Sequence, residues 1–351
     1  MRLAMPAVGF TMTIVLSTFS LANAADQTLV VQSWGGAVTA AEKTAFYEPF
    51  TAKTGIKIQI VEAGSTAGAT LKKQIQSGRV TWDVVTGFPP ETIGLFNAEG
   101  LLDRLDFKQI PTADKLSPGA KLPYAIGYDL ETIVPAFSTR PGVKPLASMA
   151  DFFDVKNFPG PRMAPNWGTA SMQCEIALTA DGVPADKLYP LDVKRCFDIW
   201  NRVKSSVTVW YSSGSQMAQA LVENAVDYCM CWDGRVQQAL QTNDKWEYVF
   251  NGAMSYFDYA GIVKGSKNVA AAERLLELMS SAEAQAEYSK IIKYGPSNPA
   301  AIALLPEAMK KRSAAQPEHQ KLIFLRPAER VTEINAGNEA LERAWASWIA
   351  Q

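Results

Sequence analysis

The sequence predicts an α/β protein of two lobes, each a mainly parallel sheet flanked by helices, joined by extended crossovers that form a hinge. Strand-like and helix-like segments alternate along the first hundred residues, which is typical of parallel strands connected by helices. A second α/β series then interrupts the first, and the first resumes near residue 257. The first lobe is therefore expected to be discontinuous in sequence.

Three strand–helix pairs predict the beginning of the first lobe. The segment 39–54 carries Ala41, Ala45, Phe46 and Phe50 at helical spacing. Gly55 follows it, and glycine readily adopts the left-handed conformation that ends many helices. The expected strands are 28–34, 56–61 and 83–87, and the expected helices are 39–54, 67–78 and the stretch from Pro89-Pro90 to Glu99.

Two extended segments, 125–128 and 132–137, are predicted to cross between the lobes, and closure by hinge motion is the expected consequence. The predicted first lobe is 25–135 plus 254–351, and the predicted second lobe is 136–253. The second lobe is expected to contain strands 162–165, 207–211 and 226–232, with helices 172–180, 190–204, 215–224 and 235–242. Strand 260–263 and helices 270–279, 282–292 and 334–349 are expected to complete the first lobe.

The first residues indicate an export signal. An apolar run lies between Arg2 and Asp26 and ends in Ala22-Asn23-Ala24, which is typical of a secretory signal peptide and its cleavage site. The run is interrupted and shorter than the ~20 apolar residues of a membrane span. We predict that residues 1–24 are removed and that the mature protein is periplasmic. An uncleaved anchor is the alternative.

Composition excludes several classes of protein. Hydrophobic residues make up 48% and charged residues 20%, with a formal net charge of -1, so an ordinary globular chain is expected. The dispersed basic residues argue against a nucleic-acid partner, and we expect a monomer. An even number of cysteines permits disulfides outside the cytoplasm. Cys174–Cys196 is the first candidate bridge, with buried free thiols as the alternative, while Cys229 and Cys231 face the same side of a predicted strand.

Enzymatic function is not expected. The single histidine, His319, leaves a serine or cysteine nucleophile without an obvious base. Phosphate-binding and dinucleotide motifs are missing from the sequence, as are the ligands of zinc or transition-metal sites. We therefore predict a binding protein with no cofactor and no metal. A hydrolase that uses a carboxylate pair remains as an alternative.

Short motifs in a fixed order carry a resemblance to a known family. They are Ser33-Trp34-Gly35-Gly36, Pro49-Phe50-Thr51-Ala52-Lys53-Thr54-Gly55-Ile56-Lys57, Trp82-Asp83-Val84-Val85, Glu99-Gly100-Leu101-Leu102, Phe158-Pro159-Gly160, Trp210-Tyr211-Ser212-Ser213-Gly214-Ser215-Gln216, Cys231-Trp232-Asp233-Gly234-Arg235 and Tyr294-Gly295-Pro296-Ser297-Asn298. Nearly the whole mature chain resembles the periplasmic solute-binding proteins of ABC importers, in their spermidine/putrescine branch. The resemblance implies a type II-like periplasmic-binding-protein fold, a small-molecule solute held between the lobes, and delivery to the membrane permease of an ABC importer. Presentation of the solute to a sensor is a further alternative.

The resemblance also implies roles for individual residues. Trp34 is similar to the aromatic platform after the first strand, and Trp232 to the aromatic residue that closes the cleft from the second lobe. Tyr256 and Asp258 resemble the family's aromatic–carboxylate pair, and Tyr294 its cleft tyrosine. The chain departs from polyamine binders by having Ala37 in place of a tyrosine, and 169–172 without the acidic residues of that helix start.

The residue types themselves favour a cationic solute. Ligands of open α/β sheets bind beyond the carboxyl ends of strands, aromatic faces attract cations, and a carboxylate adds a charged hydrogen bond. We predict an amine, quaternary ammonium or amino-acid derivative sandwiched between Trp34 and Trp232, with Asp258 balancing its charge. Packing in the core is the alternative for each Trp, a hinge salt bridge for Asp258 and a helix N-cap for Asp233. Residues expected at strand ends are Trp34, Thr86, Trp167, Trp210, Tyr211, Trp232 and Asp233.

Two further possibilities concern anions and metals. Ser213 stands in a Ser-Ser-Gly-Ser stretch before a predicted helix, where free backbone N–H groups could bind the carboxylate of a zwitterion. A simple capped helix start is the alternative there. Ferric-ion or anion capture on the same fold is the rival function, with Tyr256, Asp258 and Tyr294 as candidate ligands.

Overall fold

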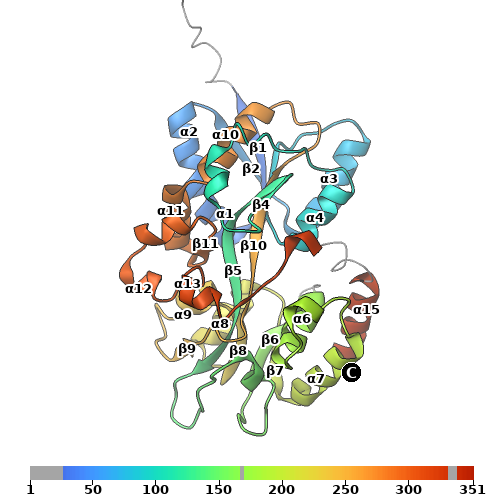
Figure 1. Cartoon of the computed structure of the whole chain (residues 1–351), viewed down its shortest axis with the longest axis vertical. Coiled ribbons are helices and arrows are strands. Elements are labelled where there is room, and N and C mark those ends of the chain that lie inside the picture. The colour runs from blue at the N-terminus through green and yellow to red at the C-terminus, as the bar shows by residue number, and fades with distance from the viewer. Residues whose placement is uncertain (1–26, 167–169, 331–337) are drawn as a thin grey trace, which may run out of the picture.

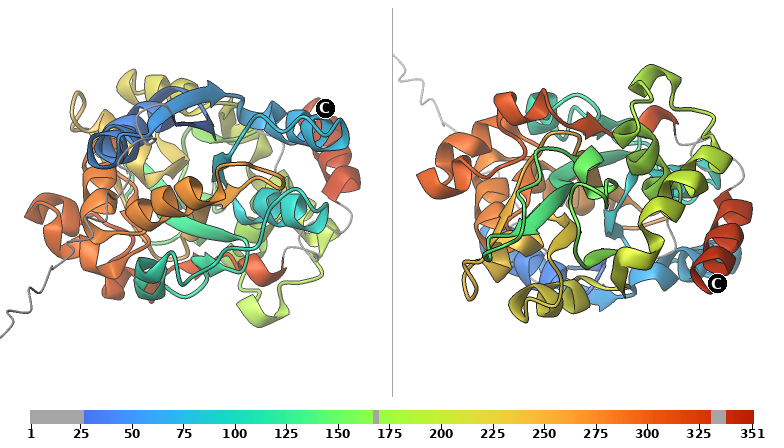
Figure 2. Two further views of the ribbon diagram at one scale, coloured as in Figure 1. Left: turned by 90° about the horizontal axis from the view of Figure 1, so that it is seen from above. Right: turned by 90° about the horizontal axis from the view of Figure 1, so that it is seen from below.

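The computed structural model describes residues 27–166, 170–330 and 338–351. The predicted signal peptide, residues 1–24, and Trp167 lie outside the described residues. Figure 1 shows two lobes stacked along the long axis, with β5 and β10 running through the middle. Figure 2 shows helices on both sides of the strands, and parallel strand pairs in each lobe confirm the predicted fold class. Among the described helices, none has the length and apolar character required to cross a bilayer.

The upper lobe is built on three parallel strands, with β1 between β2 and β3. The helix expected over 39–54 is present as two α-helices joined by a π-helical turn, 43–47. Gly55 ends it with φ 76°, and its N–H donates to the carbonyl of Thr51. The elements are β1 (Thr28–Ser33), α1 (Gly36–Glu42), α2 (Glu48–Thr54), β2 (Lys57–Glu62), α3 (Ala67–Gln76), β3 (Val84–Phe88), α4 (Pro90–Ala98), α10 (Val269–Met279) and α11 (Ala282–Ile292).

Two long antiparallel strands connect the lobes. The predicted crossovers 125–128 and 132–137 form one continuous strand, β5 (Ala125–Ser138). It pairs with β10 (Met254–Ile262) as far as Ile133 and with β8 from Ile133 onward. The return strand, expected at 260–263, begins earlier, at Met254. Every residue of β10 is buried, so the strand lacks the polar alternation that marks a strand with one solvated face.

The lower lobe repeats the parallel arrangement, with β6 between β7 and β8. Cys174 and Cys196 form a disulfide between α6 and α7, with Cα atoms 5.1 Å apart, and Cys229 pairs with Cys231 within β8. The elements are α5 (Met149–Phe152), β6 (Arg162–Pro165), α6 (Ala170–Ala180), α7 (Val193–Val203), β7 (Val207–Tyr211), α8 (Gly214–Val222), β8 (Tyr228–Trp232), α9 (Asp233–Ala239) and β9 (Trp246–Tyr248).

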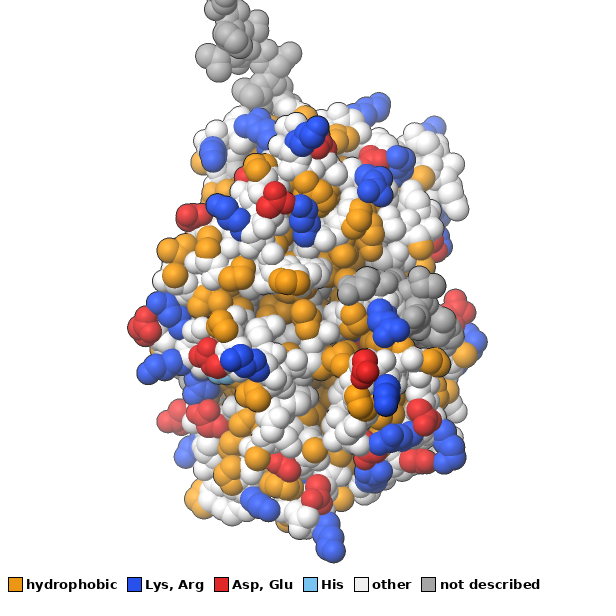
Figure 3. All heavy atoms as spheres, viewed as in Figure 1, with side chains coloured by type: hydrophobic (Ala, Val, Ile, Leu, Met, Phe, Trp, Pro, Cys, Tyr) orange, Lys and Arg blue, Asp and Glu red, His pale blue; other side chains and the backbone are white. Residues whose placement is uncertain are grey.

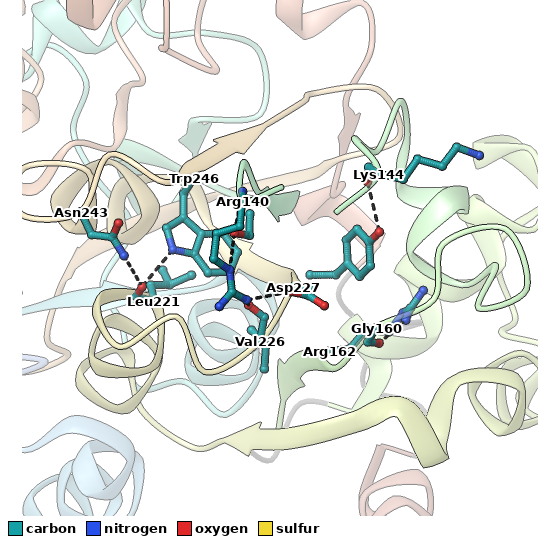
Figure 4. Close-up of polar contacts among 11 residues, drawn as sticks. Arg140, Lys144, Gly160, Arg162, Leu221, Val226, Asp227, Asn243 and Trp246 are labelled. Atoms are coloured by element: carbon teal, nitrogen blue, oxygen red, sulfur yellow. Dashed lines mark hydrogen bonds and ion pairs between the residues drawn. The ribbon is translucent and has the colours of Figure 1, made fainter. Parts of the chain in front are cut away.

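Hydrogen bonds and an ion pair of polar side chains stabilise the end of the lower lobe that is remote from the upper lobe. Arg140, just beyond β5, donates to the carbonyl of Val226 and pairs with Asp227 at 2.7 Å (Figure 4). Arg162 is fully buried and donates to the carbonyls of Phe152 and Gly160. Buried polar groups require such partners, so this end is a well-connected scaffold.

The C-terminal segment passes between the lobes a third time. β12 (Phe324–Leu325) pairs with the start of β10, the turn Ala328–Arg330 contacts α4, and α15 (Asn338–Ile349) packs on α6. The predicted boundaries place all of 254–351 in the first lobe, but α15 lies against the lower lobe (Figure 1). The boundaries at 135 and 253 stay a prediction. The remaining short elements are β4 (Lys121–Leu122), β11 (Gly295–Pro296), α12 (Glu307–Lys310) and α13 (Pro317–Gln320).

Candidate functional site

Three carboxyl groups gather on one face of the β5–β10 pair. Asp129 and Glu131 are two residues apart on β5, so their side chains share a face. Asp258 lies opposite Asp129 and Tyr256 lies opposite Glu131 in the strand register. One carboxylate oxygen from each of the three acidic residues lies within 4.8 Å of the others. The group stands just before Ile133, where β5 changes its partner from β10 to β8. It therefore lies at the junction of the lobes.

These carboxyl groups are almost inaccessible to water. Asp129 is 1% exposed and Asp258 is 7% exposed. Burial raises the pKa of Asp129, Glu131 and Asp258, and charge repulsion from Glu131 raises the pKa of both aspartates further. Among the described residues, the Oδ2 atom of Asp129 has no hydrogen-bond partner. A cation placed among the three groups would offset the repulsion and restore their ionised form.

A hydrogen-bonded chain connects Trp232 to this acidic group. The indole N–H of Trp232 donates to the Tyr256 hydroxyl at 2.8 Å, and that hydroxyl donates to Glu131 at 2.5 Å. Trp232 is half-buried and packs against the three largest hydrophobic clusters of the molecule. The ring of Tyr211 lies 6.1 Å from its ring. Trp232 is thus held in one orientation at the meeting point of both lobes.

The start of α9 adds a cation beside the acidic group. The Arg235 guanidinium lies 5.9 Å from the centre of the Tyr294 ring. The proximity of Tyr294 raises the pKa of Arg235 against the effect of burial, and Glu131 raises it further. The Nε atom of Arg235 is buried and has no partner in the described part of the chain. A Cβ atom on Gly234 would lie 2.6 Å from the Tyr294 ring, so glycine is required for this close packing.

Asp233 also belongs to this neighbourhood. It is fully buried, its Oδ1 atom accepts the N–H of Gly234 at 2.8 Å, and burial raises its pKa well above the ordinary range. Asp233 is the first residue of α9 and Trp232 occupies the N-cap position without a side-chain capping bond, so Asp233 is not the helix N-cap that its alternative role predicted. Charge repulsion from Glu131 also raises the pKa of Asp233, so Asp233 is close enough to influence the acidic group.

The structure brings together some of the predicted site residues. Trp232, Tyr256 and Asp258 lie at the junction, and Tyr211, Asp233 and Tyr294 adjoin them. Trp34 lies at the end of β1, 44% exposed, with its ring edge-on to Phe88 at 5.9 Å. The sandwich of a solute between Trp34 and Trp232 stays a prediction.

Other predicted site residues have structural contacts away from this group. Thr86 is buried in β3 and donates to the carbonyl of Gln32. Ser213 caps α8 by accepting the N–H of Gln216, as its simpler alternative proposed. Trp210 precedes Tyr211 and so faces the opposite side of β7. That side is covered by α7 and α15. The ring of Trp200 on α7 lies 5.7 Å from that of Trp210, and the rings of Trp345 and Trp348 on α15 lie 6.1 and 6.0 Å away.

Sequence reasoning missed Asp129, Glu131 and Arg235. The first two are acidic residues spaced by two within a strand that is otherwise largely apolar, and that spacing was an available signal. Arg235 ends the recognised Cys231–Arg235 motif. The carboxylate oxygens are suited to an ammonium group or to a hard metal ion, and a guanidinium is suited to a carboxylate.

Comparison with known proteins places this geometry in a family. The model of the bacterial extracellular solute-binding protein family matches residues 45–317. The chain is 31% identical to a gamma-aminobutyric acid-binding protein of Pseudomonas aeruginosa over 96% of both proteins. It is 24% identical to the putrescine-binding periplasmic protein SpuD of the same species, covering 88% of this chain and 89% of that protein.

A solved structure agrees with these relatives. The ABC transporter substrate-binding protein from Bradyrhizobium japonicum superposes with a TM-score of 0.82 at 34% identity, covering 92% of this chain and 99% of that chain. The chain is two-lobed, and its acidic group lies where the lobes meet. The protein belongs to the bacterial extracellular solute-binding family, the substrate-binding components of ABC transporters.

Proposed function

We propose that this protein captures a small amino acid with separated ammonium and carboxylate groups, such as γ-aminobutyrate, in the periplasm and delivers it to an ABC permease. The three carboxyl groups within 4.8 Å of one another carry the proposal. A primary ammonium group has three N–H donors, one for each of Asp129, Glu131 and Asp258. The relative named as a gamma-aminobutyric acid-binding protein supports the same solute class.

The other end of such a solute requires a cation. Arg235 is the cation whose charge reaches Glu131, and its guanidinium can bind a carboxylate through two parallel hydrogen bonds. A diamine would bring a second ammonium group toward Arg235 and be repelled. The site therefore favours an ω-amino acid over the polyamines that the sequence resemblance suggested. The aromatic faces of Trp232 and Tyr256 would cover the solute near its ammonium group.

A thermal-shift screen followed by calorimetry tests the solute class. The compounds are γ-aminobutyrate, putrescine, butyrate, γ-butyrobetaine and Ca²⁺. We expect γ-aminobutyrate to stabilise the protein most, by about 2.7 kcal/mol at a concentration of one hundred times its Kd. Butyrate lacks the ammonium group and γ-butyrobetaine lacks the N–H donors, so both should bind more weakly. Stronger binding of putrescine or Ca²⁺ would contradict the proposal.

The cellular form of the protein is part of the same proposal. We infer that cleavage follows Ala24, that the mature protein is a periplasmic monomer, and that it binds its solute without chemical turnover. The hinge is proposed at the boundaries 135, within β5, and 253, directly before β10. N-terminal sequencing and size-exclusion chromatography of the periplasmic fraction test processing and oligomeric state. An intact N-terminus in the membrane fraction would instead support an uncleaved anchor.

A further inference from the structure

Arg326 lies where the C-terminal segment passes between the lobes. Its backbone N–H donates to the carbonyl of Ser255 at 2.8 Å, so it is anchored beside the start of β10. Its side chain is 0% exposed. One terminal nitrogen of the guanidinium pairs with Glu91, and Nε pairs with Glu175 at 2.5 Å. The other terminal nitrogen donates to Ser171 at 3.1 Å. Arg326 thus holds two carboxylates and a hydroxyl at once.

The partners of Arg326 belong to different lobes. Glu91 lies in the first turn of α4, which follows β3 of the upper lobe. Glu175 and Ser171 lie in α6, which follows β6 of the lower lobe. Figure 1 shows these helices in the upper and lower lobes, with the C-terminal segment passing between them. In the space-filling view, hydrophobic side chains gather across the middle of this face, while charged side chains lie mostly toward the ends and edges (Figure 3). The buried ion pairs of Arg326 therefore connect the two lobes.

The contacts are unequal on the two sides. On α6, Arg326 contacts both Glu175 and Ser171, and Glu175 is also held by the Tyr189 hydroxyl at 2.8 Å. On α4, the side chain of Arg326 pairs with one described residue, Glu91. Separation of the lobes would therefore leave Arg326 with α6 and detach it from α4. Breaking a buried ion pair is strongly destabilising, so the contact between Arg326 and Glu91 opposes opening.

We propose that Arg326 is a positioning residue that latches α4 of the upper lobe to α6 of the lower lobe, and that release of Glu91 accompanies lobe opening. The latch sets the fraction of closed protein. It therefore sets how fast a bound solute escapes, although Arg326 is assigned no contact with the solute. Affinity depends on the population of the competent state, and changes in affinity within one binding site appear mainly in the dissociation rate.

Three variants test the latch. Arg326→Gln removes the charge from both sides, and Glu91→Gln removes only the partner on α4 while keeping a hydrogen-bonding side chain. Arg326→Lys keeps the charge but lacks the planar guanidinium group that binds both carboxylates. This variant should therefore restore the slow dissociation of the solute only in part. Arg195→Gln is the matched control, because Arg195 pairs with Asp181 inside the lower lobe. Stopped-flow dissociation of γ-aminobutyrate and small-angle scattering of solute-free protein are the two measurements.

The expected result is a dissociation rate about tenfold higher for both Arg326→Gln and Glu91→Gln, with a larger radius of gyration for the solute-free variants. The Arg195→Gln control should match the wild type. A lower melting temperature with unchanged dissociation and scattering would reduce Arg326 to a structural role and overturn the latch. A normal Glu91→Gln variant would also overturn it. The dissociation measurement rests on the proposed solute. If γ-aminobutyrate does not bind, the scattering measurement still decides whether the latch exists.

Discussion

Asp129 and Asp258 lie opposite each other across β5 and β10, and the N–H of Asp258 donates to the Asp129 carboxylate at 3.3 Å. Two buried aspartates in register repel each other when both are ionised, and Glu131 adds a third carboxyl group within 4.8 Å. Such a group is costly in an empty protein and favourable around a cation. This relationship supports the proposal that the three carboxyl groups form the seat of the solute's ammonium group.

Replacing Asp258 by Asn should weaken binding of γ-aminobutyrate by about 1.5–3 kcal/mol, the contribution of a hydrogen bond to a charged group. The amide keeps the size of the side chain but loses the negative charge. Titration calorimetry measures the effect. Asp114→Asn is the control, because Asp114 is exposed and pairs with Lys121 on the surface. Equal affinity of the wild type and Asp258→Asn would remove Asp258 from the site.

Replacing Arg235 by Gln should distinguish recognition of the carboxylate end of the solute from recognition of its ammonium end. Affinity for γ-aminobutyrate should fall by about 1.5–3 kcal/mol, because its carboxylate loses a charged partner. Affinity for butylamine, which lacks a carboxylate, should change little or rise, since a repelling cation is gone. Calorimetry with both compounds gives the comparison. A parallel loss for both compounds would show that Arg235 supports the fold of α9 rather than recognising a carboxylate.

Binding should strengthen as the pH rises above about 4, where unfolded carboxyl groups ionise. Burial raises the pKa of Asp129, Glu131, Asp258 and Asp233 in the folded protein. The contribution of these groups to the stability of the empty protein is therefore fully present at pH values below the pKa of the unfolded state. It is lost as the pH rises through the higher pKa of the folded state. An ammonium group favours the ionised forms, so its binding should release protons over that window.

Calorimetry in two buffers of different ionisation enthalpy measures this proton release, and Asp258→Asn should reduce it. Affinity that falls with rising pH would contradict the assignment. The titratable and charged groups that surround the three carboxyl groups come from several elements. They are Asp129 and Glu131 on β5, Tyr256 and Asp258 on β10, Asp233 and Arg235 on α9, Tyr288 on α11, Tyr294 before β11, Glu91 on α4 and Glu42 on α1.

Local patterns predicted most helices and strands, because helical spacing and the boundaries between strands and turns depend on residues that are close in the sequence. The helix expected at 282–292 and the strand at 162–165 occur with those bounds. The start of β10 was missed because burial on both faces removes its alternation. The spacing of Asp129 and Glu131 was a local signal, but the pairing of Asp129 with Asp258 joins residues 129 positions apart, and a local pattern does not predict a strand register over that range.

Trp232 and Trp210 were both predicted as site residues at strand ends, yet they should behave differently when replaced. Trp232→Ala should weaken solute binding, because its indole orients Tyr256 and lies at the junction of the lobes. Trp210→Ala should leave binding nearly unchanged and lower the free energy of unfolding, because Trp210 packs beneath α15. Loss of a well-packed large aromatic side chain costs about 3–5 kcal/mol, and less at a half-buried position such as this one. Calorimetry and urea unfolding on both variants separate the effects. Weaker solute binding by Trp210→Ala, at a temperature where the variant is folded, would show that Trp210 belongs to the solute site.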